Sequence, residues 1–284
     1  MGLEVSEDPI GESWEVSAVP SSVSIISNGE WKGRDLNSVI AENPNEILGK
    51  AVNEKYNGQL PLLVKFIDAK KDLSIQVHPN DEMAMREHGK MGKSVMWYII
   101  KAEEGGHLYA GVKQEITPYE YKKRVEDGSI TEVLAKHTVK AGDVFYLLAR
   151  RVHVICGGIL LAEVQQSSDV TYRIFDYNRP GLDGKPRELH TELAAKALDF
   201  HVEENYRTEY LDSENKAVKV IDTPYFGVRV MEIVDRSFHR DLRKYGSFIV
   251  SMCIEGDCKI RLRVNGSGFT VNGERGMDEE SGTP

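Results

Sequence analysis

Short runs of alternating apolar and polar residues recur along the chain, and residues 73–81 (LSIQVHPND) hold the most informative one. Successive side chains of a strand point to opposite faces, so Ser74, Gln76 and His78 are predicted to share one face. Pro79 ends the strand. Two interpretations fit this pattern. One is an edge strand with a solvated polar face; the other is a row of polar groups in a cavity, where Gln76 and His78 share a metal ion.

The wider pattern predicts a mainly β protein. Strands are expected at residues 60–67, 96–100, 142–148 and 158–164, with more β structure at about 217–272, and helices at 35–48, 117–136 and 189–198. Strands outnumber helices and are bounded by Gly, Asn and Asp. We therefore expect a jelly roll or barrel with a helical insertion at about 117–136. The regular strand–helix alternation of a doubly wound sheet is missing, as are the glycine motifs of nucleotide-binding loops.

The composition narrows the possible partners. The chain has 284 residues, of which 40% are hydrophobic and 29% charged, and this length is enough to bury a core. Its net charge of −9 argues against nucleic acid or an anionic membrane as the main partner. No apolar run approaches the roughly 20 residues of a membrane span. The acidic start has no signal-peptide character. The three cysteines show no paired zinc spacing, so we expect a cytoplasmic protein with reduced thiols.

Three further residues are candidates for chemistry. His153 lies among valines, either as a core histidine or as a metal ligand from a second strand. Arg173 either places a cation near a phosphate or developing oxyanion, or forms a surface ion pair with Asp176. Lys93 is a further cation at the entrance of a predicted strand.

Several motifs follow one another in the order seen in type I mannose-6-phosphate isomerases, and the chain resembles the short bacterial form of that family over roughly residues 2–260. These motifs are GESWEVS (11–17), LPLLVK (60–65), QVHPND (76–81), GKS (92–94), WY (97–98), GDVF (142–145), VH (152–153), LAEVQQ (161–166) and YR (172–173). The resemblance implies a zinc-dependent cupin that interconverts mannose 6-phosphate and fructose 6-phosphate.

The resemblance also implies roles for individual residues. It makes Gln76, His78 and His153 zinc ligands, and Ser74 and Lys93 contacts to the substrate. Arg173 is implied to be the catalytic cation beside an enediolate, with Lys93 also in the catalytic set. The implied partner is a small-molecule phosphosugar, and the implied assembly is a monomer or homodimer.

Two departures from the family pattern affect this interpretation. The family has Gly-Lys-Ser/Thr-Glu before its Trp-Tyr pair, and here Val95 stands where that glutamate ligand is expected. Arg151 replaces a glycine before the Val-His pair, which would strain a turn that needs positive φ. An alternative function is therefore a metal-impaired cupin that binds phosphosugars without turnover. A non-haem iron oxygenase is a third possibility, but the sequence places no carboxylate for its two-histidine-one-carboxylate set.

The domain organisation follows from the same resemblance, which ends after about Arg263. We expect a catalytic cupin domain at 1–187. Residues 188–284 are then a linker helix and a smaller, cupin-like β-sandwich that is incomplete.

Overall fold

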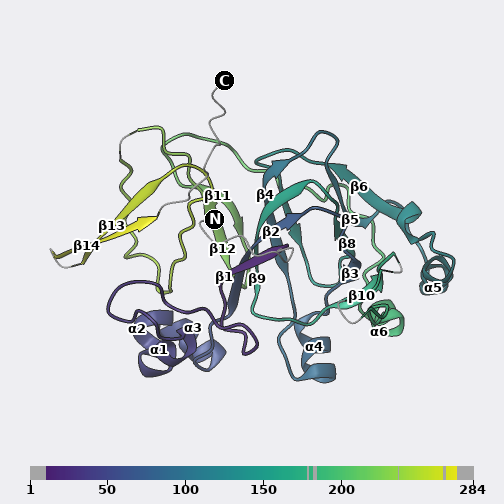
Figure 1. Cartoon of the computed structure of the whole chain (residues 1–284), viewed down its shortest axis with the longest axis horizontal. Helices are drawn as coiled ribbons and strands as arrows, with labels where there is room; N and C mark the ends of the chain where they lie inside the picture. Colours follow the sequence, from purple (N-terminus) through teal and green to yellow (C-terminus); the bar gives the residue numbers. More distant parts are fainter. Residues whose placement is uncertain (1–10, 178, 182–183, 236, 265–266, 274–284) are drawn as a thin grey trace. The chain divides into compact units, whose positions relative to one another are not determined.

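Two five-stranded antiparallel sheets form a jelly roll (Figure 1). The computed structural model describes residues 11–273 except 178, 182–183, 236 and 265–266. The first sheet has the strand order β1-β2-β9-β4-β7 and the second β10-β3-β8-β5-β6. The predicted mainly β cupin fold is confirmed.

The strands of the first sheet are β1 (Glu12–Val16), β2 (Leu62–Ala69), β4 (Val95–Ala102), β7 (Val144–Leu147) and β9 (Ile159–Gln166). Those of the second are β3 (Ile75–Val77), β5 (His107–Val112), β6 (Leu134–Thr138), β8 (His153–Ile155) and β10 (Tyr172–Phe175). The helices are α1 (Leu36–Glu42), α2 (Pro44–Leu48), α3 (Lys50–Tyr56), α4 (Asp81–His88), α5 (Pro118–Glu126), α6 (Thr191–Ala197) and the 3-10 helix η1 (Ile130–Val133). None of the helices in the described part of the chain is long and apolar enough to cross a membrane.

One apolar core lies between the two sheets and another covers the outer face of the second sheet. The inner core combines residues of both sheets, such as Trp97 and Ile99 with Leu108 and Ile155. The outer core packs strand residues of the second sheet against α5 and α6. On β8 this division follows strand alternation, because Val154 belongs to the outer core while Ile155 belongs to the inner core.

The helical insertion is shorter than predicted. Helix α5 begins after Thr117, whose side chain caps it by accepting from the Glu120 N–H at 3.1 Å. Gly128, at φ 79°, lies in the turn that follows, and η1 ends at Val133. Residues 134–136 are not helical but begin β6, because Leu134 pairs with Val112 in the second sheet.

The C-terminal β region contains two separate hairpins. Residues 11–247 form one compact unit, which includes β11 (Val218–Asp222) and β12 (Gly227–Val230). The described residues after 247 belong to a second unit with β13 (Cys258–Val264) and β14 (Ser267–Gly273). The boundary predicted at residue 187 stays a prediction.

Candidate metal and substrate site

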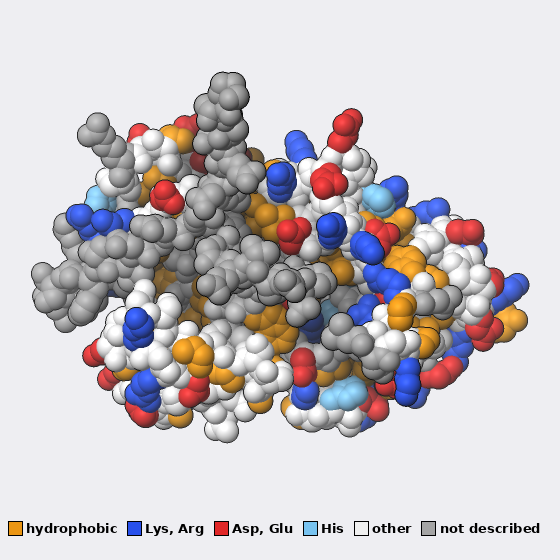
Figure 2. All heavy atoms as spheres, viewed as in Figure 1, with side chains coloured by type: hydrophobic (Ala, Val, Ile, Leu, Met, Phe, Trp, Pro, Cys, Tyr) orange, Lys and Arg blue, Asp and Glu red, His pale blue; other side chains and the backbone are white. Residues whose placement is uncertain are grey.

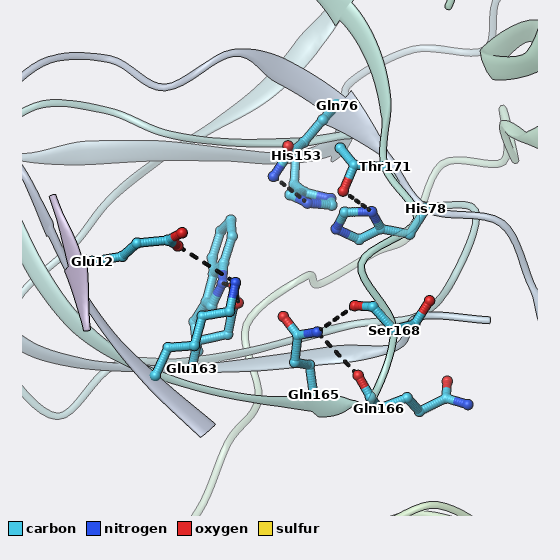
Figure 3. A network of polar contacts seen from close by, with 11 residues as sticks. Glu12, Gln76, His78, His153, Glu163, Gln165, Gln166, Ser168 and Thr171 are labelled. Carbon is cyan, nitrogen blue, oxygen red and sulfur yellow. Dashed lines mark hydrogen bonds and ion pairs between the residues drawn. The ribbon is translucent and has the colours of Figure 1, made fainter. Parts of the chain in front are cut away.

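An amide and two imidazoles meet on the inner face of the second sheet (Figure 3). Gln76 on β3 pairs directly with His153 on β8, and their Nε2 atoms lie 3.3 Å apart. The His78 and His153 ring centroids are 4.7 Å apart, within reach of one ion. Strand β3 lies between β10 and β8, so the edge-strand interpretation is wrong.

Backbone and hydroxyl groups fix the orientation of both rings. His153 Nδ1 lies 2.9 Å from the Arg151 carbonyl oxygen and donates to it, which leaves Nε2 as the acceptor. His78 Nδ1 lies 3.4 Å from Thr171 Oγ1. Histidines that bind metals commonly hold their second nitrogen in this way.

Both imidazoles are neutral at neutral pH. Burial and the Lys93 ammonium lower the pKa of His78 well below its ordinary value. Burial lowers the pKa of His153 to about 4, although the hydrogen bond to the Arg151 carbonyl opposes the shift. A neutral imidazole has the lone pair that a metal ion needs.

The amide and the two imidazoles are groups that can bind zinc, but the cluster contains no carboxylate. Imidazole nitrogens are ordinary zinc ligands, and half a turn of the Gln76 amide would direct its oxygen toward His153. Val95, fully buried on β4, has no donor atom. Within the described residues, no three His, Cys, Asp or Glu side chains are grouped to hold a metal ion.

The Gly-Lys-Ser segment is held against the loop that follows β3. A Cβ on Gly92 would lie 2.5 Å from backbone atoms of Asn80 and Asp81, so only glycine fits there without a shift. The Gly92 N–H donates to Asp81 Oδ1 at 2.8 Å, and the Lys93 N–H donates to the Pro79 carbonyl at 3.1 Å. This clamp fixes the backbone from which Lys93 projects.

Lys93 is a buried cation near the cluster. Burial lowers the pKa of its ammonium to about 8, although the Glu163 carboxylate opposes the shift. Lys93 acts electrostatically on His78, His153 and Glu163, so the four groups share one region.

A line of charged side chains crosses the first sheet beside the cluster. Lys65 on β2 and Trp97 on β4 both pair in register with Glu163 on β9. Lys65 Nζ lies 3.6 Å from Glu163 and 3.4 Å from Glu12, and Trp97 Nε1 donates to Glu163 Oε2 at 2.8 Å. The Trp97 and His153 rings are 5.3 Å apart, so this face of the first sheet is directed at the cluster.

Lys65 and Glu163 are not among the site residues predicted from the sequence. Burial alone would raise the pKa of the Glu163 carboxyl, but Lys65, Lys93 and the Trp97 indole outweigh it and hold the pKa below its ordinary value. Glu163 is therefore ionised, with both oxygens engaged by neighbours.

We expect Glu163→Gln to lower the free energy of unfolding by about 3 kcal/mol, because it leaves buried ammonium groups without their counter-charge. The amide still accepts from the Trp97 indole, so the loss reports on charge. Urea denaturation measures it. Glu12→Gln is the matched control: its partner is also Lys65, but Glu12 is 48% exposed, so we expect less than about 1 kcal/mol. Equal small losses in both variants would contradict an ionised, buried Glu163.

The two remaining predicted site residues are Arg173, which lies on β10, and Ser74, which directly precedes β3. Arg173 on β10 pairs in register with Gln76, and its Nη1 donates to the Glu188 carbonyl at 2.9 Å. Its buried Nε has no partner in the described residues. Asp176 binds Arg179 and Arg187 at 2.7 and 2.6 Å, so the predicted surface pair with Arg173 is wrong. Ser74 is buried one residue before β3.

The strained turn before His153 is displaced by one residue from the prediction. Arg150, at φ 79°, takes the left-handed conformation that we expected at position 151. Its N–H donates to the His78 carbonyl at 2.7 Å and its Nε to the Ala197 carbonyl at 3.0 Å. These bonds hold the turn and tie it to the residues directly after β3, where His78 lies.

A jelly roll with imidazoles on its inner face places the protein in the cupin class. The model of the phosphomannose isomerase type I catalytic domain matches residues 4–103. The probable mannose-6-phosphate isomerase GmuF of Bacillus subtilis is 34% identical over 262 residues, 91% of this chain and 80% of that protein. The chain belongs to the type I phosphomannose isomerase family.

Solved structures share this fold. The crystal structure of mannose 6-phosphate isomerase from Bacillus subtilis is 32% identical and matches with a TM-score of 0.68, over 77% of this chain and 69% of that one. A zinc-bound crystal structure of mannose 6-phosphate isomerase, 17% identical, shares the fold with a TM-score of 0.57, over 77% of this chain and 74% of that one.

Proposed function

We propose that the protein is a zinc-dependent isomerase that interconverts mannose 6-phosphate and fructose 6-phosphate. The observation that carries this proposal is the cluster of Gln76, His78 and His153 inside a jelly roll of this family. These three residues would hold the metal, which would supply a Lewis acid that polarises sugar oxygens.

The reaction moves a proton between C1 and C2 through a cis-enediol or enediolate. It therefore needs a cation beside the developing oxyanion and an anchor for the phosphate. Arg173 is our candidate for the cation, because its register with Gln76 directs it to the metal side of β3. Lys93 and Ser74 are our candidates for contacts to the substrate, with Lys93 also in the catalytic set.

The surface is compatible with a small-molecule substrate. Acidic and basic side chains are interspersed over the face of the jelly-roll unit seen on the right of Figure 2. The assignments to a monomer or homodimer and to the cytoplasm stay predictions.

The decisive experiment is to measure turnover of mannose 6-phosphate after removal and return of zinc. Chelator-treated protein should be inactive, and added zinc should restore turnover. The same treatment of His153→Ala should restore none, because the variant loses the nitrogen that faces Gln76. Binding of mannose 6-phosphate without turnover in the zinc-loaded wild type would instead support the silent phosphosugar-binding cupin.

A further inference from the structure

Gln165 on β9 has a buried amide oxygen that the fold does not use. The side chain is 0% exposed, and its Oε1 has no hydrogen-bond partner among the described residues. A buried acceptor left without a donor costs about 1–3 kcal/mol, so such a group calls for an explanation.

The orientation of this amide is fixed by its own nitrogen. Nε2 donates to the Gln166 carbonyl at 3.0 Å and to the Ser168 carbonyl at 2.9 Å. Turning the amide over would place its oxygen against both carbonyl oxygens. The atom without a partner is therefore the oxygen.

The register of the first sheet places Gln165 on the face that is directed at the imidazoles. Gln165 lies two residues beyond Glu163, so the two side chains share a face of β9. Directly opposite it on β4 is Val95, two residues before Trp97, whose ring contacts His153. Figure 3 shows the amide between Glu163 and His78, with its oxygen pointing toward the space below the His153 ring.

We propose that Gln165 Oε1 is a fourth protein ligand to the metal ion, alongside Gln76, His78 and His153. The proposal rests on the proposed zinc site. Val95, opposite Gln165, offers no donor, and both oxygens of Glu163 are engaged by Trp97 and Lys65. The Gln165 oxygen is held in place before the metal arrives, so little ordering entropy is lost on binding.

This ligand set is neutral, which distinguishes it from a set that contains a carboxylate. An amide oxygen satisfies the coordination number without compensating the charge of the ion. The buried Glu163 carboxylate faces two ammonium groups, Lys65 and Lys93. We therefore expect binding by four protein ligands, with an affinity that is limited by charge.

The test is the affinity for zinc alone, measured by competition with a chromogenic chelator on the full chain. Gln165→Leu should lower it by about 10- to 100-fold, at least the effect of losing a group that supports a ligand. Gln166→Leu is the matched control. It removes an adjacent, equally buried amide that binds Ser94 and Asp81 instead, and should leave the affinity unchanged. His78→Ala reports on the proposed zinc site itself.

The outcomes separate this inference from the proposed function. If His78→Ala leaves the affinity unchanged, the proposed zinc site is wrong and the inference falls with it. If His78→Ala abolishes binding while Gln165→Leu matches Gln166→Leu, only the role of Gln165 is overturned. Weaker binding of mannose 6-phosphate with unchanged zinc affinity in Gln165→Leu would likewise overturn it, and assign the oxygen to the sugar.

Gln165→Leu leaves the Ser168 carbonyl without its donor, so this variant can fail to fold. A second measurement therefore uses the wild-type protein. Anomalous diffraction from zinc-loaded wild-type crystals locates the ion directly. An oxygen of Gln165 within about 2.2 Å of zinc supports the proposal, and a longer separation overturns it.

Discussion

Replacing Arg173 by alanine is expected to lower turnover of mannose 6-phosphate by about 10²–10³-fold, the effect of losing one preorganised donor to an oxyanion. A guanidinium is always charged and donates in a fixed fork, which suits an enediolate or phosphate oxygen. The melting temperature should fall by less than about 4 °C, because within the described residues the side chain makes one hydrogen bond, to the Glu188 carbonyl. Steady-state kinetics and thermal unfolding of one variant give both numbers.

Arg187→Ala is the matched control for this prediction. Arg187 also carries a guanidinium, but its two hydrogen bonds within the described residues go to Asp176, which is buried and keeps Arg179 as a partner. We expect Arg187→Ala to lower stability by about 1–3 kcal/mol and to leave turnover nearly unchanged. Arg173→Lys should recover part of the lost turnover, because the charge returns without the fork. Equal turnover in Arg173→Ala and the wild type would assign Arg173 a structural role.

The centre of the site could be predicted from the sequence because it depends on a local rule. Alternation along residues 73–78 directs Gln76 away from the apolar face, and the structure brings it to His153. Ser74 is a weaker case, since it precedes the three residues that form β3, and alternation does not fix its direction. The helical pattern at 117–136 failed at its end, where pairing of Leu134 with Val112 overrides a helical periodicity.

The remaining parts of the site depend on register between distant strands. Lys65 and Glu163 are nearly 100 positions apart, and only the β2–β9 pairing shows that they neutralise each other. A signal was present, since each is a lone charge in a strongly apolar run, and such charges are buried in pairs. Gln165 and Gln166 look alike in the sequence, but the structure gives one an unused oxygen and the other structural contacts.

Val95→Glu is expected to tighten zinc binding by about 10²-fold and to raise turnover at limiting zinc. The new carboxylate would lie directly opposite Gln165 in the sheet, on the face shared with Trp97, and would add the negative charge that the present ligands lack. Without metal the same carboxylate is buried and unpaired, so the free energy of unfolding should fall by about 2 kcal/mol or more. Chelator competition gives the affinity, and thermal unfolding with and without zinc gives the stability.

Val95→Met separates the donor from the added volume, because methionine enlarges the same fully buried position without a carboxylate. We expect it to destabilise the protein both with and without zinc, whereas zinc should restore the stability of Val95→Glu. In the Val95→Glu background, Gln165→Leu should cost less zinc affinity than in the wild type, because the carboxylate supplies the ligand that the amide provides alone. Unchanged zinc affinity in Val95→Glu, with the loss of stability still present, would show that position 95 faces away from the ion.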